Sequence, residues 1–453
     1  MKLLLRVVVY VMTFVIFFGG IGVYGYICTN QEYWNPTRQT PIPALQRVSV
    51  PEYNLQKPTV AVILSNSTTE VFDFMVPYEL FAMTESYNVY AVAPDKNMKT
   101  LSGGLDLIPH YSFDELDRLL GGSPDLIVIP AMPMADEIKY KPVREWIRKH
   151  SDTELLSICA GGLNLADTGL LKGKEATTDW KSFDYQEVNK YPDTKWRRDL
   201  HYVVDGNIVS SAAITSGIDA VLYVISKQLG EPMAEKIANK IKYPSYHFVK
   251  NPKVDPNYVD GSELIYTFNT AFQWHKKSAG VWLYNGMDEG PLTTIFDTYA
   301  NSGTTKIYTV SNAKQPIVTK YHLNLVSRYH LLNVPNLDRM FVPGEEAKSV
   351  AAEEVKDWNG NKVTPEFIHS GYSGRFMFDG TLEDLAKQED VLTAKYGAKR
   401  IEYRAKNLKF QGRPFSYESF GIPVLISLVA ILTAYFIDRR FILKVKRRKG
   451  VNH

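Results

Sequence analysis

The sequence predicts a doubly wound α/β protein in two tandem lobes, with one transmembrane helix near each end of the chain. Three observations lead to this fold class. Apolar strand-like runs alternate with helical patterns from residue 58 onward, the same order of segments recurs in the second half, and an uncharged apolar stretch lies near each terminus. The chain has 453 residues, 45% apolar and 22% charged, a composition typical of proteins that bury large cores.

The two apolar stretches predict a membrane protein. Residues 1–28 are predicted to form a transmembrane anchor, because residues 7–27 carry no charge and would span about 30 Å as a helix. A signal peptide is the alternative, but no small-x-small cleavage pattern follows. Residues 420–437 form a second predicted span, and residues 438–453 follow it as a basic tail. By the positive-inside rule, we expect a two-pass protein of the cell membrane with both termini cytoplasmic and an extracytoplasmic main domain.

Between the spans, segments follow one another in the order expected of a sheet covered by helices. Residues 29–57 contain four prolines and predict a tether that lifts the domain off the membrane. Four runs predict buried strands, PTVAVILSN, YNVYAVAP, PDLIVIPA and ELLSICA, and three predict intervening helices, TTEVFDFMVPYELFAM, PVREWIRKH and NLADTGLL. LDLIPHYSF predicts an edge hairpin, HYVVDGNIVSSAA another hairpin, and GIDAVLYVISKQLG and MAEKIANKIKY two closing helices. These segments make a first lobe of residues 58–250.

The pattern of the first lobe recurs later in the chain. The matched starts are Val60 with Ala279 (279 minus 60, offset 219), Leu105 with Leu323 (offset 218), Pro124 with Leu337, and Ala238 with Ala405 (offset 167). The shrinking offset leaves about fifty residues missing from the second copy, at the place where the first copy carries CAGG and the residues after it. We therefore predict a linker at 251–277, a second lobe at 278–412 that lacks the site, and a pseudo-dimer. Chance similarity between two α/β lobes is the alternative.

Cys159 is the candidate nucleophile. In LLSICAGGLNLADTGLLKGKEATTDW, a strand ends at Cys159, small residues including Ala160 and Gly161 make a tight turn, and a helix begins. A thiol at the start of a helix is favoured as the thiolate, its nucleophilic form. The alternative is an inert core cysteine. Cys28 is the other cysteine, so we expect no disulfide framework.

These residues carry a resemblance to a known family. The run ICAGGLNLADTGLLKGKEATTDW, with TSGIDAVLYVISKQLGEPMAEKIANKI downstream and FDFMVPYELF upstream, resembles the ThiJ/PfpI superfamily of the class I glutamine amidotransferase-like fold. It is most similar to the amidotransferase-like domain of AraC-type regulators and to isocyanide hydratases. The resemblance is strong over residues 58–250 and weak over 278–412. It implies a flavodoxin-like parallel sheet sandwiched by helices.

The resemblance assigns roles to two side chains. Cys159 matches the nucleophile of the family's elbow, and Asp73 matches the acidic residue that touches it. Such a carboxyl could hold a proton or act as general acid or base. A helix N-terminal charge that interacts with the macrodipole is the alternative for Asp73. The position aligned with Asp73 in the second lobe is Leu292, which favours loss of chemistry there.

Three departures from the family pattern bear on activity. Asp179 stands where relatives often have His, so a Cys-His mechanism requires His110, His201 or His247 to fold back toward the thiol. Ala131 and Met132 stand where relatives have two glycines that supply an oxyanion donor. Ala160 stands where hydratase-like relatives tend to have Thr, although its N–H could still serve as a donor.

The sequence therefore predicts a membrane-tethered protein with a cysteine-centred small-molecule pocket, hydrolase-like or hydratase-like in activity. The alternatives are a ligand or redox sensor coupled to a membrane-protein partner, and a structural pseudoenzyme. The net charge of +3 gives no basic face, so we expect no nucleic-acid partner. The nine histidines show no ligand spacing and no Gly-rich phosphate loop is present, so we expect neither a metal nor a cofactor.

Overall fold

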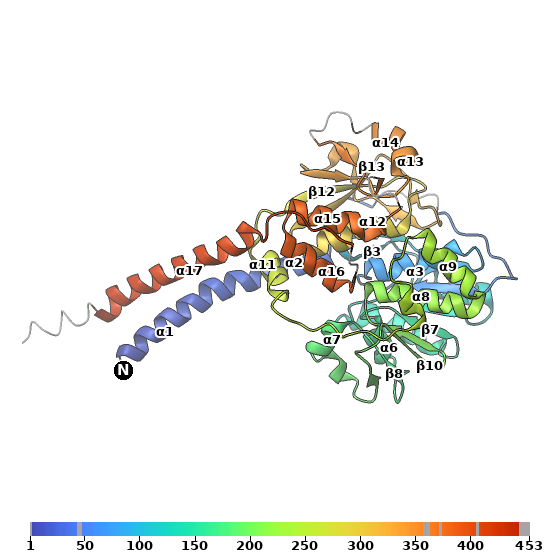
Figure 1. Cartoon of the computed structure of the whole chain (residues 1–453), viewed down its shortest axis with the longest axis horizontal. Helices are drawn as coiled ribbons and strands as arrows, with labels where there is room; N and C mark the ends of the chain where they lie inside the picture. Colours follow the sequence, from blue (N-terminus) through green and yellow to red (C-terminus); the bar gives the residue numbers. More distant parts are fainter. Residues whose placement is uncertain are drawn as a thin grey trace, which may run out of the picture.

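The computed structural model describes residues 2–42, 48–356, 358, 363–370, 374–404 and 407–443. An α/β body carries two long helical segments that extend from one side of it (Figure 1). The basic residues of the predicted tail from Lys444 onward lie outside the described residues, as does Ala405.

The first lobe is built on a seven-stranded sheet in the order β10-β11-β7-β6-β1-β2-β5. β1 pairs in parallel with β2 and β6, β7 pairs in parallel with β6 and β11, and β10 pairs antiparallel with β11. The strands are β1 (Thr59–Ile63), β2 (Asn88–Ala93), β5 (Tyr111–Ser112), β6 (Leu126–Ile129), β7 (Glu154–Ser157), β10 (Tyr202–Asp205) and β11 (Ile208–Ser211), with a separate pair β8 (Glu175–Ala176) and β9 (Lys195–Trp196). This confirms the predicted parallel α/β sheet.

Helices cover both faces of this sheet because alternate residues of each strand point to opposite sides. Val60 and Val62 of β1 pack in one core with α3 and α8, whereas Ala61 and Ile63 pack in another with α4 and α5. The helices are α3 (Val71–Met83), α4 (Phe113–Leu120), α5 (Glu137–Lys149), α6 (Gly161–Asp167), α7 (Trp180–Asp184), α8 (Ile214–Leu229), α9 (Glu231–Lys240) and α10 (His247–Lys250).

The second lobe contains a parallel five-stranded sheet in the order β16-β13-β12-β17-β18. Its central strand β12 pairs in parallel with β13 and β17, as β1 pairs with β2 and β6. The strands are β12 (Lys277–Trp282), β13 (Thr305–Ser311), β16 (Tyr329–His330), β17 (Arg339–Phe341) and β18 (Pro365–Glu366). The helices are α12 (Glu289–Thr298), α13 (Ala347–Val350), α14 (Ala352–Lys356), α15 (Met377–Gln388) and α16 (Val391–Arg400).

A four-stranded antiparallel sheet joins the two lobes. It has the order β14-β15-β4-β3 and contains β3 (Lys99–Leu101), β4 (Leu105–Ile108), β14 (Ile317–Val318) and β15 (Asn324–Val326). The expected edge hairpin at LDLIPHYSF is therefore wrong, because β4 is paired on both sides. Leu107 lies opposite Leu325, its own partner in the sequence match at offset 218 (325 minus 107).

One of the four sequence matches has a different register. Tyr243 N donates to Ala238 O at 2.9 Å after α9, and Tyr403 N donates to Ala398 O at 2.9 Å after α16. The residue before each tyrosine has a positive φ, 56° and 57°. The same local geometry therefore follows Ala238 and Ala398, which are 160 residues apart (398 minus 238), whereas the predicted match Ala405 lies outside the described residues.

The predicted tether does not hold the body away from the helices. α2 (Gly20–Trp34) extends six residues into the range 29–57, and the chain beyond it lies on the bridging sheet. Arg38 Nη1 forms an ion pair with the buried Asp106 at 2.9 Å, and Ser49 N donates to Asn324 Oδ1 at 2.7 Å. These polar contacts hold the described parts of the segment, on either side of residues 43–47, against the bridging sheet.

The predicted linker 251–277 contains a helix, α11 (Glu263–Phe272). α11 lies against α2 closely enough that a Cβ built on Gly25 would be 2.2 Å from Ala271 O. Phe272 also packs on Phe18, with ring centroids 5.3 Å apart. The hydrophobic periodicity of residues 263–272 is too weak to predict a helix from the sequence. The packing against α2 stabilises this helix.

The two terminal helical segments are long and apolar enough to cross a membrane, judged by length and composition. The first comprises α1 (Lys2–Phe14), a π-helical turn (Val15–Gly19) and α2, and the second is α17 (Tyr417–Ile437) with a π-helical turn (Asp438–Leu443). α1 and α17 run alongside each other away from the body (Figure 1). Arg6 Nε and Asp438 Oδ2 form an ion pair at 2.9 Å near their outer ends.

Candidate functional site

Cys159 lies on a sharp turn between β7 and α6. Its φ of 56° is in the left-handed region, which is uncommon for a residue with a side chain. A Cβ built on Gly161 would be 2.2 Å from Ile129 O, and one built on Gly162 would be 2.6 Å from Thr177 O. The small residues after Cys159 are therefore required by the close approach of backbone, and the predicted elbow is present.

Asp73 lies in the first turn of α3 and is completely buried. Its Oδ2 accepts a hydrogen bond from Ala131 N at 3.2 Å. Its Oδ1 is buried with no hydrogen-bond partner among the described residues. An unpartnered buried carboxyl oxygen is costly unless the group is protonated or meets a ligand.

Burial and close acidic groups raise the pKa of the thiol and of its acidic neighbours. Burial, and then the charges of Asp73, Asp179 and Glu70, raise the pKa of Cys159 well above its usual value. Burial, and then Glu70, raise the pKa of Asp73 well above its usual value. The helix start favours the anion, but burial and the neighbouring carboxyls act in the opposite direction and raise the pKa of the thiol.

The backbone amides that were candidates for an oxyanion site are mostly occupied. Ala131 N donates to Asp73, Met132 N donates to Asn164 Oδ1 at 3.0 Å, and Gly161 N donates to Ile158 O at 2.8 Å. Ala160 N–H is the exception, since its hydrogen bond lowers the pKa of Cys159. Ala160 is thus the one member of this set that is directed at the sulfur.

Asp179 acts as the N-cap of α7. Its Oδ1 accepts from Lys181 N at 3.1 Å and from Ser182 N at 3.3 Å, and its Oδ2 accepts from Ser182 Oγ. Burial raises the pKa of Asp179. The preceding residue, Thr178, donates its hydroxyl to Cys159 O at 3.1 Å. Asp179 therefore lies beside the elbow as a capping residue whose charge opposes a thiolate.

The candidate histidines are engaged elsewhere. His110 Nδ1 accepts from Ala91 N at 3.0 Å on the far strand β2. His201 Nδ1 contacts Asp219 Oδ2 at 2.7 Å, and the His247 ring stacks on Phe248 with centroids 4.1 Å apart. These contacts do not support a Cys-His mechanism, which would require one of the three histidines to lie beside Cys159.

The sequence reasoning missed a buried acidic cluster that joins the site to α2. Glu70 caps α3 by accepting from Asp73 N at 2.8 Å, and Tyr33 of α2 donates its hydroxyl to Glu70 Oε1 at 3.2 Å. Burial and the neighbouring Asp297 raise the pKa of Glu70 to about 8. Arg400 Nη2 contacts Asp297 Oδ1 at 3.0 Å. The repeat offered a signal, because Glu70 aligns with Glu289 at offset 219 (289 minus 70).

Three cavities of the described structure lie away from Cys159. The largest of three, of about 670 Å³, lies between α2 and the second sheet, and the others have volumes of about 430 Å³ and about 190 Å³. Cys159 lines none of these three. Cys159 itself is partly exposed, and the predicted cysteine-centred pocket stays a prediction.

Comparison with known proteins identifies the class of this domain. Residues 58–227 match the sequence model of the DJ-1/PfpI family, so this part of the chain is a DJ-1/PfpI family domain. The match ends within α8 and so covers the elbow and Asp73.

Individual proteins are similar to parts of this chain. The chain is 29% identical over 174 residues to the isonitrile hydratase of Pseudomonas putida, a match that spans 38% of this chain and 72% of that protein. It is 32% identical over 99 residues to the HTH-type transcriptional regulator CdhR of Pseudomonas aeruginosa, spanning 21% of this chain and 29% of the regulator. A solved structure of a ThiJ/PfpI family protein from Pseudomonas syringae is 20% identical, covers 47% of this chain and 86% of its own, and has a TM-score of 0.37.

Proposed function

We propose that this protein is a membrane-tethered DJ-1/PfpI-domain enzyme in which Cys159 and Asp73 add water to a small electrophile. The observation that carries the proposal is the pair itself: a thiol on a left-handed elbow beside a buried carboxyl whose Oδ1 has no partner among the described residues. The similarity to an isonitrile hydratase over 72% of that protein supports a hydration rather than a proteolytic reaction.

The electrostatics favour acid-assisted addition over acyl transfer. Acyl transfer requires a base and donors for an oxyanion, whereas the amides of Ala131 and Met132 are occupied and the position of the family histidine holds Asp179. A neutral thiol and a protonated Asp73 suit addition across a polarised multiple bond. The Cys159 sulfur bonds to the electrophilic carbon while the thiol proton reaches the substrate through the Asp73 carboxyl. Water then adds to the adduct and the thiol leaves with a proton, so the net reaction is hydration.

The terminal helices support membrane attachment of this domain. Two apolar helices leave one side of the body, and the Arg6–Asp438 ion pair joins α1 to the residue that follows α17. An arrangement with both termini cytoplasmic and the α/β body outside is consistent with that pairing. Labelling of a reporter cysteine at Asn35, in a chain without its native cysteines, tests it. Labelling of intact cells supports the proposal, and labelling only after permeabilisation contradicts it.

The activity is tested with a small isonitrile as substrate and the full chain in detergent. We expect formamide product from the parent and from Cys28→Ser, but none from Cys159→Ala, because the nucleophile is absent. Alkylation of the Cys28→Ser protein by iodoacetamide should show a thiol that titrates above a free cysteine, whose pKa is about 8.5. Asp73→Asn should lower this pKa. A thiol that titrates below that value, or turnover retained in Cys159→Ala, would contradict the proposal.

A second candidate function is a sensor, and one contact favours it. The Tyr33 hydroxyl of α2 donates a hydrogen bond to the Glu70 carboxyl, which also accepts one from the backbone N–H of Asp73. These two hydrogen bonds connect the site to the proposed membrane helix. Oxidation or ligation of Cys159 would change the charge beside this chain of bonds. A sensor predicts reversible sulfenic acid at Cys159 without turnover, and altered crosslinking between α1 and α17 that Tyr33→Phe abolishes.

A further inference from the structure

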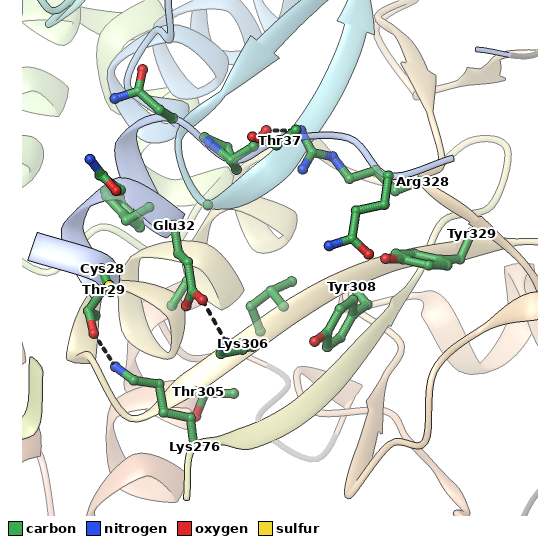
Figure 2. Close-up of a pocket in the computed structure, with 18 residues that line it drawn as sticks. Cys28, Thr29, Glu32, Thr37, Lys276, Thr305, Lys306, Tyr308, Arg328 and Tyr329 are labelled. Carbon is green, nitrogen blue, oxygen red and sulfur yellow. Dashed lines mark hydrogen bonds and ion pairs between the residues drawn. The ribbon is translucent and has the colours of Figure 1, made fainter. Parts of the chain in front are cut away.

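A polar cavity of about 670 Å³ lies where α2 meets the second lobe (Figure 2). α2 contributes Thr29 and Glu32, Lys276 lies just before β12, and Lys306 lies on the neighbouring strand β13. The rings of Tyr308 and Tyr329 lie next to each other at the opposite end of the cavity, with centroids 5.5 Å apart. The volume lies within the range of small-molecule sites, roughly 300–1,000 Å³.

Lys276 is a largely buried cation with neutral partners. Its Nζ donates to Thr29 Oγ1 at 2.7 Å and to Gly303 O at 2.7 Å, which uses two of the three N–H donors of an ammonium. Burial lowers the pKa of Lys276 to about 8. A buried ammonium is costly unless an anion compensates its charge, so this side chain suits a negatively charged ligand.

The charges around the cavity are unequal. Its lining contains three cationic side chains, Lys276, Lys306 and Arg328, and one carboxylate, Glu32, a difference of +2 (3 minus 1). Lys306 neutralises Glu32 through an ion pair of 2.6 Å. Arg328 pairs with Asp106 at 2.9 Å, and Arg38 pairs with the same carboxylate. Two arginines therefore share one negative charge, which leaves a net charge of +1 (2 minus 1) in this group. The cavity therefore favours an anion over a cation or a neutral ligand.

We propose that this cavity binds a phosphate-bearing ligand, with Lys276 as the principal phosphate contact and Lys306 beside it. Phosphate oxygens are acceptors of charge-assisted hydrogen bonds, and an ammonium binds them without a fixed orientation. The two tyrosine rings provide an apolar wall for the organic part of the ligand. Because the cavity adjoins α2, the phosphate can belong to a phospholipid headgroup or to a soluble phosphate ester. This site is separate from Cys159 and does not depend on the proposed hydration.

The test measures ligand-induced thermal stabilisation of the full chain. Glycerol 3-phosphate is added to protein in detergent, with glycerol as the matched neutral ligand, and protein in phosphatidylglycerol nanodiscs is compared with protein in phosphatidylcholine nanodiscs. Lys276→Met should weaken binding by about ten- to a hundredfold, the usual effect of losing a charged hydrogen bond. Lys277→Met is the matched control, since Lys277 pairs with Glu389 at 2.9 Å and does not line the cavity. Binding should weaken as the pH rises above about 8, where Lys276 loses its proton.

The outcomes separate the two sources of phosphate. Saturable stabilisation by glycerol 3-phosphate that Lys276→Met removes supports a soluble ester, and stabilisation by phosphatidylglycerol alone, removed by the same change, supports a lipid headgroup. If Lys276→Met does not fold, Lys276→Arg should fold and retain binding because the charge is kept. Absence of stabilisation by both phosphate probes, or equal loss in Lys276→Met and Lys277→Met, would overturn the proposal.

Discussion

Each lobe contains a parallel sheet, and the two sheets differ in the strand at one side of the central strands. In the first lobe, β7 runs beside β6 and leads into Cys159, whereas the strand beside β17 in the second lobe is the two-residue β18. Both lobes begin the following helix with a buried glutamate, Glu70 or Glu289, and only the first has an aspartate one turn later. A buried glutamate is therefore common to both lobes, and Asp73 together with the elbow is found in the first lobe alone among the described residues.

The largest expected effect concerns the bridging sheet. Asp106 is buried between Arg38 and Arg328, and its aligned partner is Asn324 (324 minus 106, offset 218). Asp106→Asn makes the first lobe resemble the second and leaves two arginines without their carboxylate, which should cost about 3–5 kcal/mol of unfolding free energy. Urea unfolding in detergent measures this. Asn324→Ala should cost less, because it removes neutral hydrogen bonds to Ser49, and an equal or larger loss would contradict the asymmetry.

The second prediction concerns the elbow. Gly161→Ala should cost about 3 kcal/mol or more, because the new Cβ would be 2.2 Å from a backbone carbonyl that cannot move freely. Gly397→Ala in α16 of the second lobe is the matched control. Its nearest contact would be 3.5 Å, so it should be neutral or stabilise the helix by up to about 1 kcal/mol. Thermal unfolding compares them, and similar midpoints would show that the elbow tolerates a side chain.

The third prediction uses the glutamates that the lobes share. Burial raises the pKa of Glu70 to about 8 and that of Glu289 to about 7. Both folded-state pKa values lie above the unfolded value of about 4.3. The protonated glutamates therefore contribute their full share of stability below about pH 4.3, and this share is lost as the pH rises through about 7 for Glu289 and about 8 for Glu70. Glu70→Gln should reduce the loss of stability between pH 5 and pH 9 by on the order of 2 kcal/mol.

The control for this pH dependence is an exposed glutamate. Glu353→Gln alters a surface ion pair with Lys356 and should leave the pH profile of unfolding unchanged. Glu289→Gln should act as Glu70→Gln does but over a slightly lower pH range. A parent protein whose unfolding midpoint rises between pH 5 and pH 9 would contradict the assigned direction of both pKa shifts.

The smallest expected effect is on reactivity. Asp73→Leu copies the residue of the second lobe, Leu292, into the first. The Asp73 carboxyl group raises the pKa of Cys159, so its loss should lower that pKa and make alkylation at pH 8 faster than in the parent. The Ala131 amide loses its acceptor, which costs about 1–3 kcal/mol. Mass spectrometry of the Cys28→Ser background follows the reaction, and an unchanged rate would mean that Asp73 does not influence the thiol.

Much of the fold followed from periodicity that can be read locally. The parallel strands of the first lobe, the β10–β11 hairpin, the elbow at Cys159 and the two apolar helices were predicted, because each depends on residues close in sequence. α11 and the contacts of Arg38 and Ser49 with the bridging sheet were not predicted. α11 packs against Gly25, Arg38 pairs with Asp106 and Ser49 bonds to Asn324, so these features depend on partners far along the chain.

The sequence by itself determined the class of the domain, the position of Cys159 and Asp73 and the apolar ends, because motif spacing and hydrophobicity are local properties. Only the tertiary structure decided the protonation of the site. The pKa of Cys159 depends on burial and on Glu70, Asp73 and Asp179, which come from two segments about a hundred residues apart. The tertiary structure likewise placed Tyr33 against Glu70 and Lys276 against Thr29, because desolvation and charge proximity exist only once distant segments pack together.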